Sequence, residues 1–272
     1  MNPAPAPAPG TPVASALPAL LDRYGPRLHG LALRLCRNRA DADDLVQEVF
    51  LRALRAWPRF QGRSDPGTWL YTIAGRACRE RTRRKGGADR RAVAMSQLMP
   101  WRESTVTALA AAPDPDARAL AAERAEAVAR VQHEITRLPE HLRLPLVLKE
   151  VLGLSIDDAA AALGLAANTI KTRLHRARLA LRKAMTARAP AVPAPAPIYE
   201  KQVCLDLLKA KMDAMDRGGT AAGFAVPKAD LCARCRAVFR ELDLVQDACA
   251  GLAGDDMPPA LRRRIIEVIQ RH

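Results

Sequence analysis

Residues 169–182, TIKTRLHRARLALR, combine an apolar stripe with a dense set of cations. The stripe recurs at helical spacing and predicts one buried helix face, formed by Ile170, Leu174, Ala177 and Leu181. Around it stand six basic or titratable side chains: Lys171, Arg173, His175, Arg176, Arg178 and Arg182. A helix of this kind needs a partner for its charged side, which could be water, another protein, a membrane surface or the phosphates and base edges of DNA.

The residues before this helix favour DNA. Ser155, with Asp158 three residues later, predicts a capped short helix, and Gly164 predicts its end. A short helix, a turn and a longer basic helix form the layout of a helix-turn-helix, whose second helix enters the major groove. In that layout the first residues of the basic helix face base edges and later cations face phosphates. We therefore expect DNA contacts from Asn168, Thr169, Lys171, Thr172, Arg173, Arg176 and Arg178.

Two alternatives remain for the basic helix. Taken alone, its charge favours a solvated helix in an ordinary bundle, and only the capped helix and the turn before it favour DNA. A membrane-surface helix is a weaker interpretation, because the stripe is rich in Ala and has no interfacial aromatic side chains.

Charge and composition agree with a polyanionic partner. The 272 residues carry a formal net charge of +14, of which residues 201–272 contribute only +2. Aromatic residues make up 4% of the chain and Ala, Leu and Arg dominate, which predicts an all-α fold. The sequence shows neither a membrane-length apolar run nor, in MNPAPAPAPG, a secretory signal. We expect a cytoplasmic protein without a membrane partner, whose six cysteines are thiols or metal ligands.

Composition divides the chain into segments. Two breaks, around GGADRR and at the Pro/Ala-rich stretch ARAPAVPAPAPIYE, separate three helical blocks. The predicted segments are a disordered Pro/Ala tail (1–13), a first helical block (14–86), a linker (87–115), the helix-turn-helix block (116–186), a Pro/Ala linker (187–200) and a cysteine-containing block (201–272).

Two motifs then carry a family resemblance. SIDDAAAALGLAANTIKTRLHRARLALRK resembles region 4 of the extracytoplasmic-function (ECF) sigma factors, the small promoter-recognition subunits of bacterial RNA polymerase. DADDLVQEVFLRALRAWPRFQGRSDPGTWLYTIAGRACRERTRRK resembles their region 2. The two motifs stand in the family's order and cover roughly residues 14–186, so the resemblance implies two small helical domains, region 2 and region 4, joined by a linker.

The resemblance also implies roles. In region 2 the acidic second helix docks on the polymerase β′ subunit, and the matching residues are Asp43, Asp44, Gln47 and Glu48. The third helix melts and holds the −10 element, and its matching residues are Trp69, Tyr71, Thr72, Arg76, Arg79 and Arg83. Region 4 reads the −35 element. The acidic set could instead be a solvated helix face, and Trp69 and Tyr71 could equally belong to the core. Where the family often has Arg-Asn, this chain has Gly75-Arg76.

The last block is similar to the zinc-finger-like anti-sigma domain. The resemblance implies metal ligands at Cys204, Cys232 and Cys235, with Zn²⁺ as the expected ion. The family histidine is replaced by Lys228, and Cys249 could be a fourth ligand only if the chain folds back. A redox pair of Cys232 and Cys235, or a metal-free helical domain with buried cysteines, are the alternatives.

The sequence therefore predicts a non-enzymatic sigma factor. Its expected partners are the β′ and β subunits of core RNA polymerase, promoter DNA, and either its own C-terminal block or a separate anti-sigma factor. The C-terminal block is expected to regulate, by inhibition or by activation. The alternative is a helix-turn-helix transcription regulator that never joins the polymerase.

Overall fold

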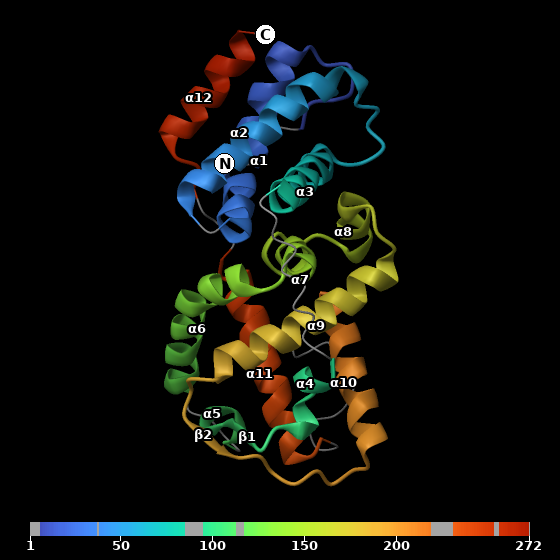
Figure 1. The fold of residues 1–272 in the computed structure, drawn as a ribbon, viewed down its shortest axis with the longest axis vertical. Helices are drawn as coiled ribbons and strands as arrows, with labels where there is room; N and C mark the ends of the chain where they lie inside the picture. The colour runs from blue at the N-terminus through green and yellow to red at the C-terminus, as the bar shows by residue number, and fades with distance from the viewer. Residues whose placement is uncertain are drawn as a thin grey trace. The chain divides into compact units, whose positions relative to one another are not determined.

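The structure is a computed structural model that describes residues 6–36, 38–84, 95–112, 117–218, 231–252 and 256–271. The regular secondary structure of these residues is helical apart from one two-stranded sheet, which confirms the predicted all-α class (Figure 1). In the described ranges, no helix is both long enough and apolar enough to cross a membrane. The chain forms two compact units, each of which combines segments that are distant in the sequence.

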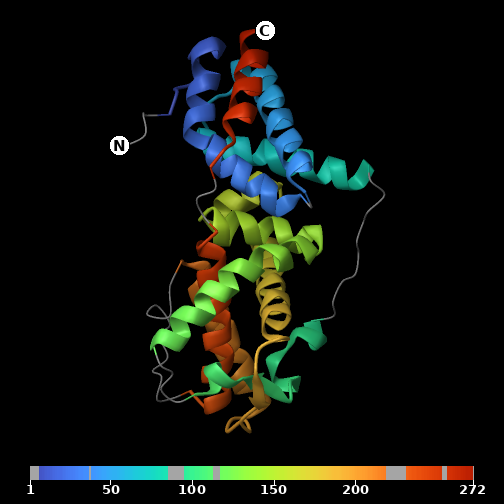
Figure 2. The same ribbon diagram turned by 90° about the vertical axis from the view of Figure 1, so that its left-hand side faces the viewer.

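The first unit contains residues 1–90, 143–170 and 252–272. Its helices are α1 (Val13–Leu35), α2 (Arg39–Ala56), α3 (Pro66–Arg84), α8 (Ile156–Leu163) and α12 (Pro259–Gln270), with a 3-10 turn (Trp57–Arg59) and a π-helical turn (Val147–Val151). Helices α1, α2 and α3 pack against one another around a leucine-rich core, and α8 packs on α3. Both ribbon views show α12 alongside α1 and α2 (Figures 1 and 2).

The second unit contains residues 91–142 and 171–251. Its elements are α4 (Met95–Leu98), a 3-10 turn (Pro100–Arg102), β1 (Thr105–Thr107), α5 (Ala108–Ala111), α6 (Ala117–Arg137), β2 (Ala191–Pro193), α10 (Lys201–Asp216) and α11 (Ala233–Ala250). Helix α7 (Glu140–Leu146) and helix α9 (Ala167–Thr186) each begin in one unit and end in the other. Helix α11 packs against α6, α5 and α10, and it supplies much of the apolar core.

The compact units do not follow the predicted segments. The cysteine-containing block is divided, because α10 and α11 belong to the second unit and α12 to the first. Both predicted linkers are partly structured: β1 and β2 pair antiparallel, with Val106 opposite Val192. Proline fits this sheet because Pro193 is the last residue of an edge strand, where a missing N–H is tolerated.

The N-terminal tail also differs from its prediction. Residues 1–5 lie outside the described ranges, but a turn follows in which Thr11 N donates to Ala8 O at 3.1 Å. The indole Nε1 of Trp57 donates to Thr11 O at 2.8 Å, which satisfies a polar atom of an otherwise buried ring. The expectation of disorder throughout 1–13 was therefore wrong for this stretch.

Candidate nucleic-acid and protein-binding surfaces

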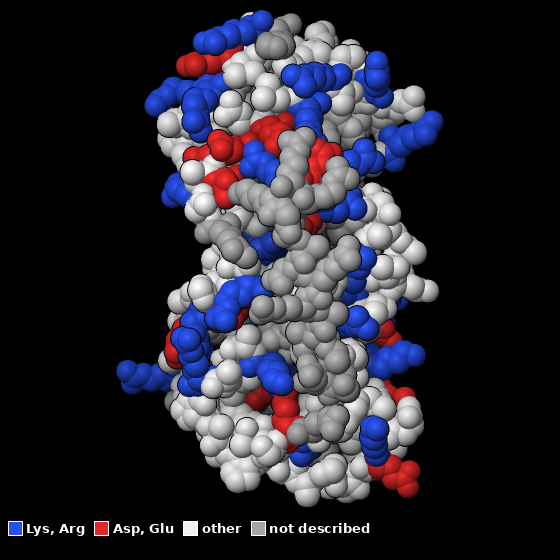
Figure 3. Space-filling view, viewed as in Figure 1, with Lys and Arg blue, Asp and Glu red and all other residues white. Residues whose placement is uncertain are grey.

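Helix α2 carries the acidic residues predicted to bind polymerase. Asn38 caps the helix by accepting a hydrogen bond from Asp41 N at 2.8 Å, which fixes where the helix begins. Asp43 Oδ1 lies 3.0 Å from Nε2 of the buried His29. Of the four predicted residues, Asp44 is exposed and the others are half-buried. Figure 3 shows acidic side chains gathered over this helix with basic ones among them.

Glu48 is engaged inside the first unit. Its Oε1 accepts from Arg52 at 2.6 Å and its Oε2 from Arg81 at 2.8 Å, while Arg52 also donates to Glu80 at 2.6 Å. These four side chains form one network that ties α2 to α3. The network orients Glu48 and neutralises much of its charge, so Asp44 is the more available acid on this helix.

Helix α3 carries the residues predicted to hold melted DNA. Tyr71 is only 5% exposed, and burial, opposed in part by the charge of Arg27, raises its pKa to about 12. The prediction of Tyr71 as a surface for unstacked bases was therefore wrong for this structure: the ring belongs to the core. Trp69 is half-buried, with its ring centroid 5.7 Å from that of Trp57 and 5.1 Å from that of Phe60.

The remaining α3 residues differ in their surroundings. Thr72 is half-buried, and its hydroxyl donates to Thr68 O at 3.0 Å. Arg76 and Arg79 are both exposed, but Arg79 also donates to Gly75 O at 3.3 Å and to Leu163 O at 3.0 Å, at the end of α8. The side chain of Arg83 lies outside the described residues.

Gly75 lies where α8 packs against α3. A Cβ added there would lie 3.1 Å from Leu163 Cδ2. The departure from the family pattern at this position therefore coincides with a close approach between the two helices.

The helix-turn-helix signals are confirmed locally. Ser155 Oγ accepts from Asp158 N at 3.0 Å at the start of α8. Gly164 ends that helix in the left-handed conformation with φ +61°, which a side chain would disfavour. Helix α9 then begins at Ala167.

The two sides of α9 match the predicted pattern over its first half. All four stripe residues, Ile170, Leu174, Ala177 and Leu181, are buried. The predicted DNA contacts here are exposed or half-buried: Asn168, Thr169, Lys171, Thr172, Arg173 and Arg176. Burial, and then the charges of Arg173 and Arg176, lower the pKa of His141 at the start of α7.

Arg178 does not belong to that exposed set. Its side chain is 0% exposed, and its Nη1 donates to Oδ1 of Asp216 on α10 at 2.6 Å. The prediction that Arg178 contacts the DNA backbone was therefore wrong: the guanidinium is buried against a carboxylate of the C-terminal block. Burial alone would raise the pKa of Asp216, but His175 and Arg178 outweigh it and hold that pKa below its ordinary value.

Arg182 is buried in the same way. Its Nη1 donates to Glu241 on α11 at 2.6 Å and its Nη2 to Glu103 at 2.5 Å. Glu241 also accepts from Thr107 N at 2.9 Å. Sequence reasoning missed the burial of these two arginines, although a signal existed: Arg178 and Arg182 continue the i+4 row of Ile170 and Leu174 into the core.

The C-terminal thiols lie in an apolar cluster of the second unit. Cys232 caps α11, and its Sγ accepts from Cys235 N at 3.4 Å. Burial opposes ionisation of Cys232, but hydrogen bonds from the backbone and thiol of Cys235 outweigh it and lower its pKa. Burial, and then Cys232 and Cys204, raise the pKa of Cys235 to about 12.

These thiols do not have the spacing of a zinc site. Around a tetrahedral zinc, sulfur atoms lie about 3.8 Å apart. In the described ranges, the one group of three potential ligands within 4.8 Å of one another contains no cysteine. Cys249 was wrongly considered as a fourth ligand: it lies on the same continuous helix as Cys235, fourteen residues on and roughly 21 Å along the axis. Lys228 lies outside the described residues.

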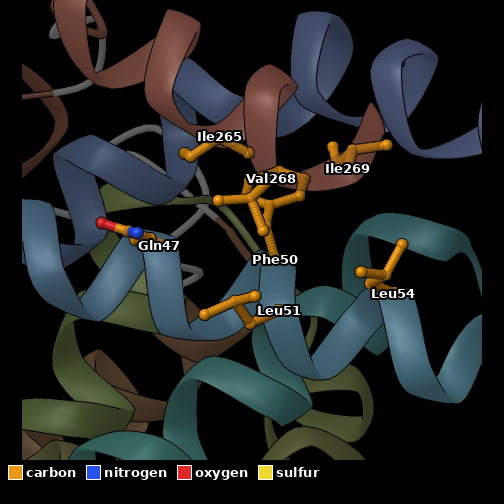
Figure 4. A pocket seen from close by; sticks show the side chains of 7 residues that line it. All are labelled: Gln47, Phe50, Leu51, Leu54, Ile265, Val268 and Ile269. Atoms are coloured by element: carbon orange, nitrogen blue, oxygen red, sulfur yellow. The ribbon is translucent and has the colours of Figure 1, made fainter. Parts of the chain in front are cut away.

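Helix α12 covers part of α2. Leu261, Ile265 and Ile269 are buried on its inner face. Figure 4 shows residues of the two helices around one hollow, lined by Gln47, Phe50, Leu51, Leu54, Ile265, Val268 and Ile269. The chain leading into α12 is also held, since Arg34 donates to Leu252 O and Met257 packs against Gly25.

Comparisons with known proteins agree with both sigma regions. Residues 20–87 match the family model "Sigma-70 region 2" and residues 129–181 match "Sigma-70, region 4". RNA polymerase sigma-H factor of Pseudomonas aeruginosa is 32% identical over 62% of this chain and 86% of its own length. ECF RNA polymerase sigma-E factor of Escherichia coli K12 is 32% identical over 60% and 82%.

A third relative and a solved structure extend the comparison. ECF RNA polymerase sigma factor SigW of Bacillus subtilis is 30% identical over 60% of this chain and 86% of its own. The solved sigma factor RpoE of Bartonella quintana, in complex with the anti-sigma factor NepR, is 27% identical over 61% of this chain and 92% of its own, with a TM-score of 0.43. From the matched regions and these curated relatives, the chain belongs to the extracytoplasmic-function sigma factors of the sigma-70 family.

Proposed function

We propose that this chain recruits core RNA polymerase to promoters as a sigma factor, acting in the cytoplasm. Region 4 reads the −35 element through the first half of α9, with Arg173 and Lys171 as its main cations. Region 2 holds the melted −10 element on α3, where Arg76 supplies exposed positive charge. Helix α2 binds the β′ subunit through Asp44, and the β subunit completes the contact with the core enzyme. Family membership and the exposure of these side chains support this assignment.

The C-terminal block is proposed to inhibit this activity in cis. One observation carries the proposal: within each unit, this block packs on a helix that we assign to promoter or polymerase binding. Helix α12 lies on α2, and α10 and α11 supply the carboxylates that pair with Arg178 and Arg182 of α9. Because these segments are covalently attached, their effective concentration is high and modest contacts suffice to compete with polymerase or DNA.

The test uses the full chain in promoter-dependent transcription with purified core polymerase. Ile265→Glu places a charge in the α12–α2 contact and should release α12, since burying one such side chain contributes about 1.5–3 kcal/mol. We expect transcription several-fold above that of the wild type. Gln270→Glu introduces the same residue at an exposed position of α12 and should change nothing. Unchanged or lower transcription from Ile265→Glu, with an intact fold, would refute inhibition by α12.

A second variant separates the sigma factor from a regulator that never joins the polymerase. Asp44→Arg reverses the exposed acid of α2 and should reduce co-purification with core polymerase while leaving duplex DNA binding unchanged. Equal recovery of polymerase with both proteins would count against the proposed polymerase contact.

The thiols favour redox sensing within the C-terminal block. Cys232 has the lowered pKa of an attacking thiol and Cys235, next to it, is the resolving partner. Oxidation by a small-molecule disulfide would form the Cys232–Cys235 bond and break the disulfide of the oxidant, which takes up the two electrons and the two thiol protons and leaves as two thiols. Zinc binding by Cys204, Cys232 and Cys235 stays a prediction, and the spacing of the three sulfurs counts against it.

Mass spectrometry after equilibration with oxidised and reduced glutathione tests this pair. We expect a loss of two mass units that maps to the peptide containing both cysteines, and none in Cys235→Ser. A fully reduced pair under oxidising buffer would refute the redox proposal.

A further inference from the structure

The second unit contains a cluster of potential metal ligands that none of the functions above uses. His175 projects from α9, and Asp213 and Asp216 project from one face of α10, three residues apart. One ligand atom from each residue lies within 4.8 Å of the other two. The cluster therefore joins the helix that we assign to DNA reading to the first helix of the C-terminal block.

The distances fit a first-row divalent cation. His175 Nε2 lies 3.4 Å from Asp216 Oδ2. Ligands at 2.0–2.1 Å from a tetrahedral zinc are about 3.3 Å from one another, so these two atoms have the spacing that a shared ion requires. Imidazole and carboxylate donors suit zinc, cobalt or nickel, and three protein ligands leave a position for water.

Two of these atoms lack another partner. The Asp216 side chain is 3% exposed, and its Oδ2 and the buried Nε2 of His175 face each other as an ion pair at 3.4 Å, without a well-formed hydrogen bond to any other group. A buried polar atom without a partner costs free energy, so two such atoms facing each other indicate that something belongs between them. A proton shared by the two would satisfy them, but it would leave Asp213 without a role.

The charges around the cluster leave room for a cation. Arg178 is bound to the other oxygen of Asp216 at 2.6 Å and compensates one of the two carboxylates. With a neutral imidazole, the group keeps one net negative charge. An outer partner of this kind also fixes the orientation of a ligating carboxylate. Asp213 is half-buried, which gives an ion access from solvent.

We propose that His175, Asp213 and Asp216 bind a divalent transition-metal ion that fastens α10 to α9. The site is distinct from the cysteines, and its nitrogen and oxygen donors suit zinc, cobalt or nickel. Under the proposed function, on which this consequence rests, metal binding would hold the C-terminal block on the DNA-reading helix. Metal binding itself is measured without reference to transcription.

Cobalt titration of the reduced, metal-stripped full chain tests the site, because Co²⁺ reports its ligands in its spectrum. We expect one equivalent to give weak visible bands without the intense near-ultraviolet band of a cobalt–thiolate bond. Asp213→Asn removes one ligand but leaves the Arg178–Asp216 pair intact, and should weaken cobalt binding at least tenfold. Asp206→Asn, at an exposed position of the same helix, should bind as the wild type does.

Thermal unfolding provides a second readout. Zinc should raise the melting temperature of the wild type and of Asp206→Asn, and should raise that of Asp213→Asn far less. The proposal is overturned if the wild type binds no cobalt, if cobalt shows only thiolate bands, or if Asp213→Asn binds with unchanged affinity.

Discussion

The two halves of helix α9 have the same kind of sequence and opposite surroundings. In the first half, Lys171 and Arg173 are partly exposed to solvent on the predicted DNA-reading face. In the second half, Arg178 and Arg182 are 0% and 1% exposed and lie against acids of the C-terminal block. An arginine on a basic helix therefore indicates a DNA contact only where its helical row does not lead into the core.

The two halves also differ in what a positive charge contributes to, which is either DNA affinity or folding stability. An exposed cation contributes to affinity for a polyanion and little to folding. A buried cation is tolerated in the fold only when a carboxylate pairs with it. Removing one member of such a pair strongly destabilises the fold, because the other charge is then left unpaired in a low-dielectric interior. Variants in the two halves should consequently fail in different assays.

The largest effect is expected at Arg182. Arg182→Ala leaves Glu241 and Glu103 without their cation, so the free energy of unfolding should fall by about 3–5 kcal/mol. Urea denaturation measures this loss. Arg182→Met combined with Glu241→Gln removes both charges and keeps an acceptor for Thr107 N, and it should recover most of the stability. A loss below 1 kcal/mol for the single variant would show that this half of α9 is not buried in solution.

A smaller effect, on a different property, is expected at Arg173. Arg173→Ala should weaken binding to a promoter duplex about tenfold, because one base or phosphate contact contributes about 1–3 kcal/mol, and should leave the unfolding free energy unchanged. Fluorescence anisotropy over a range of salt concentrations measures the affinity. Lys183→Ala, at an exposed position of the other half, is the matched control and should bind nearly as well as the wild type.

The pH dependence of stability should also differ between the halves. Because the pKa of Asp216 in the folded chain lies below its ordinary value of 3.8, the ionised carboxylate stabilises the fold fully above that value. The contribution is lost as the pH falls through the lowered folded pKa, so near pH 3 only part of it disappears. Urea denaturation between neutral pH and about pH 3 should show this component in the wild type and not in Asp216→Asn. Parallel curves for the two proteins would contradict it.

Local features of this fold could be predicted from the sequence. The cap at Ser155, the stop at Gly164 and the stripe of α9 depend on residues three or four positions apart, and the structure has all of them. Tyr71 could have been placed better by the same rule. It shares a helical row with Ala74 and Cys78, both buried, so its position already indicated the core.

The partners of the buried arginines could not be predicted in this way. Asp216, Glu241 and Glu103 lie 38, 59 and 79 residues from the arginines that they bind. Charge complementarity would allow many other pairings, and only the packing of α10 and α11 selects these. The metal cluster depends on the same packing, because His175 and Asp216 are on different helices and no local spacing pattern in the sequence connects them.

The smallest effect is expected where the same chemistry is exposed. Arg262 of α12 pairs with Asp22 of α1 at 2.6 Å, a distance equal to that between Arg178 and Asp216, but the two side chains are 48% and 56% exposed. Water and salt screen this pair, and ordering two long side chains costs entropy, so Arg262→Ala should lower the free energy of unfolding by only about 0–1 kcal/mol. Urea denaturation of the full chain at low and high salt measures it, with the largest difference at low salt. A loss close to that of Arg182→Ala would mean that burial is not what distinguishes the two halves of α9, and that ion-pair distance alone sets the contribution.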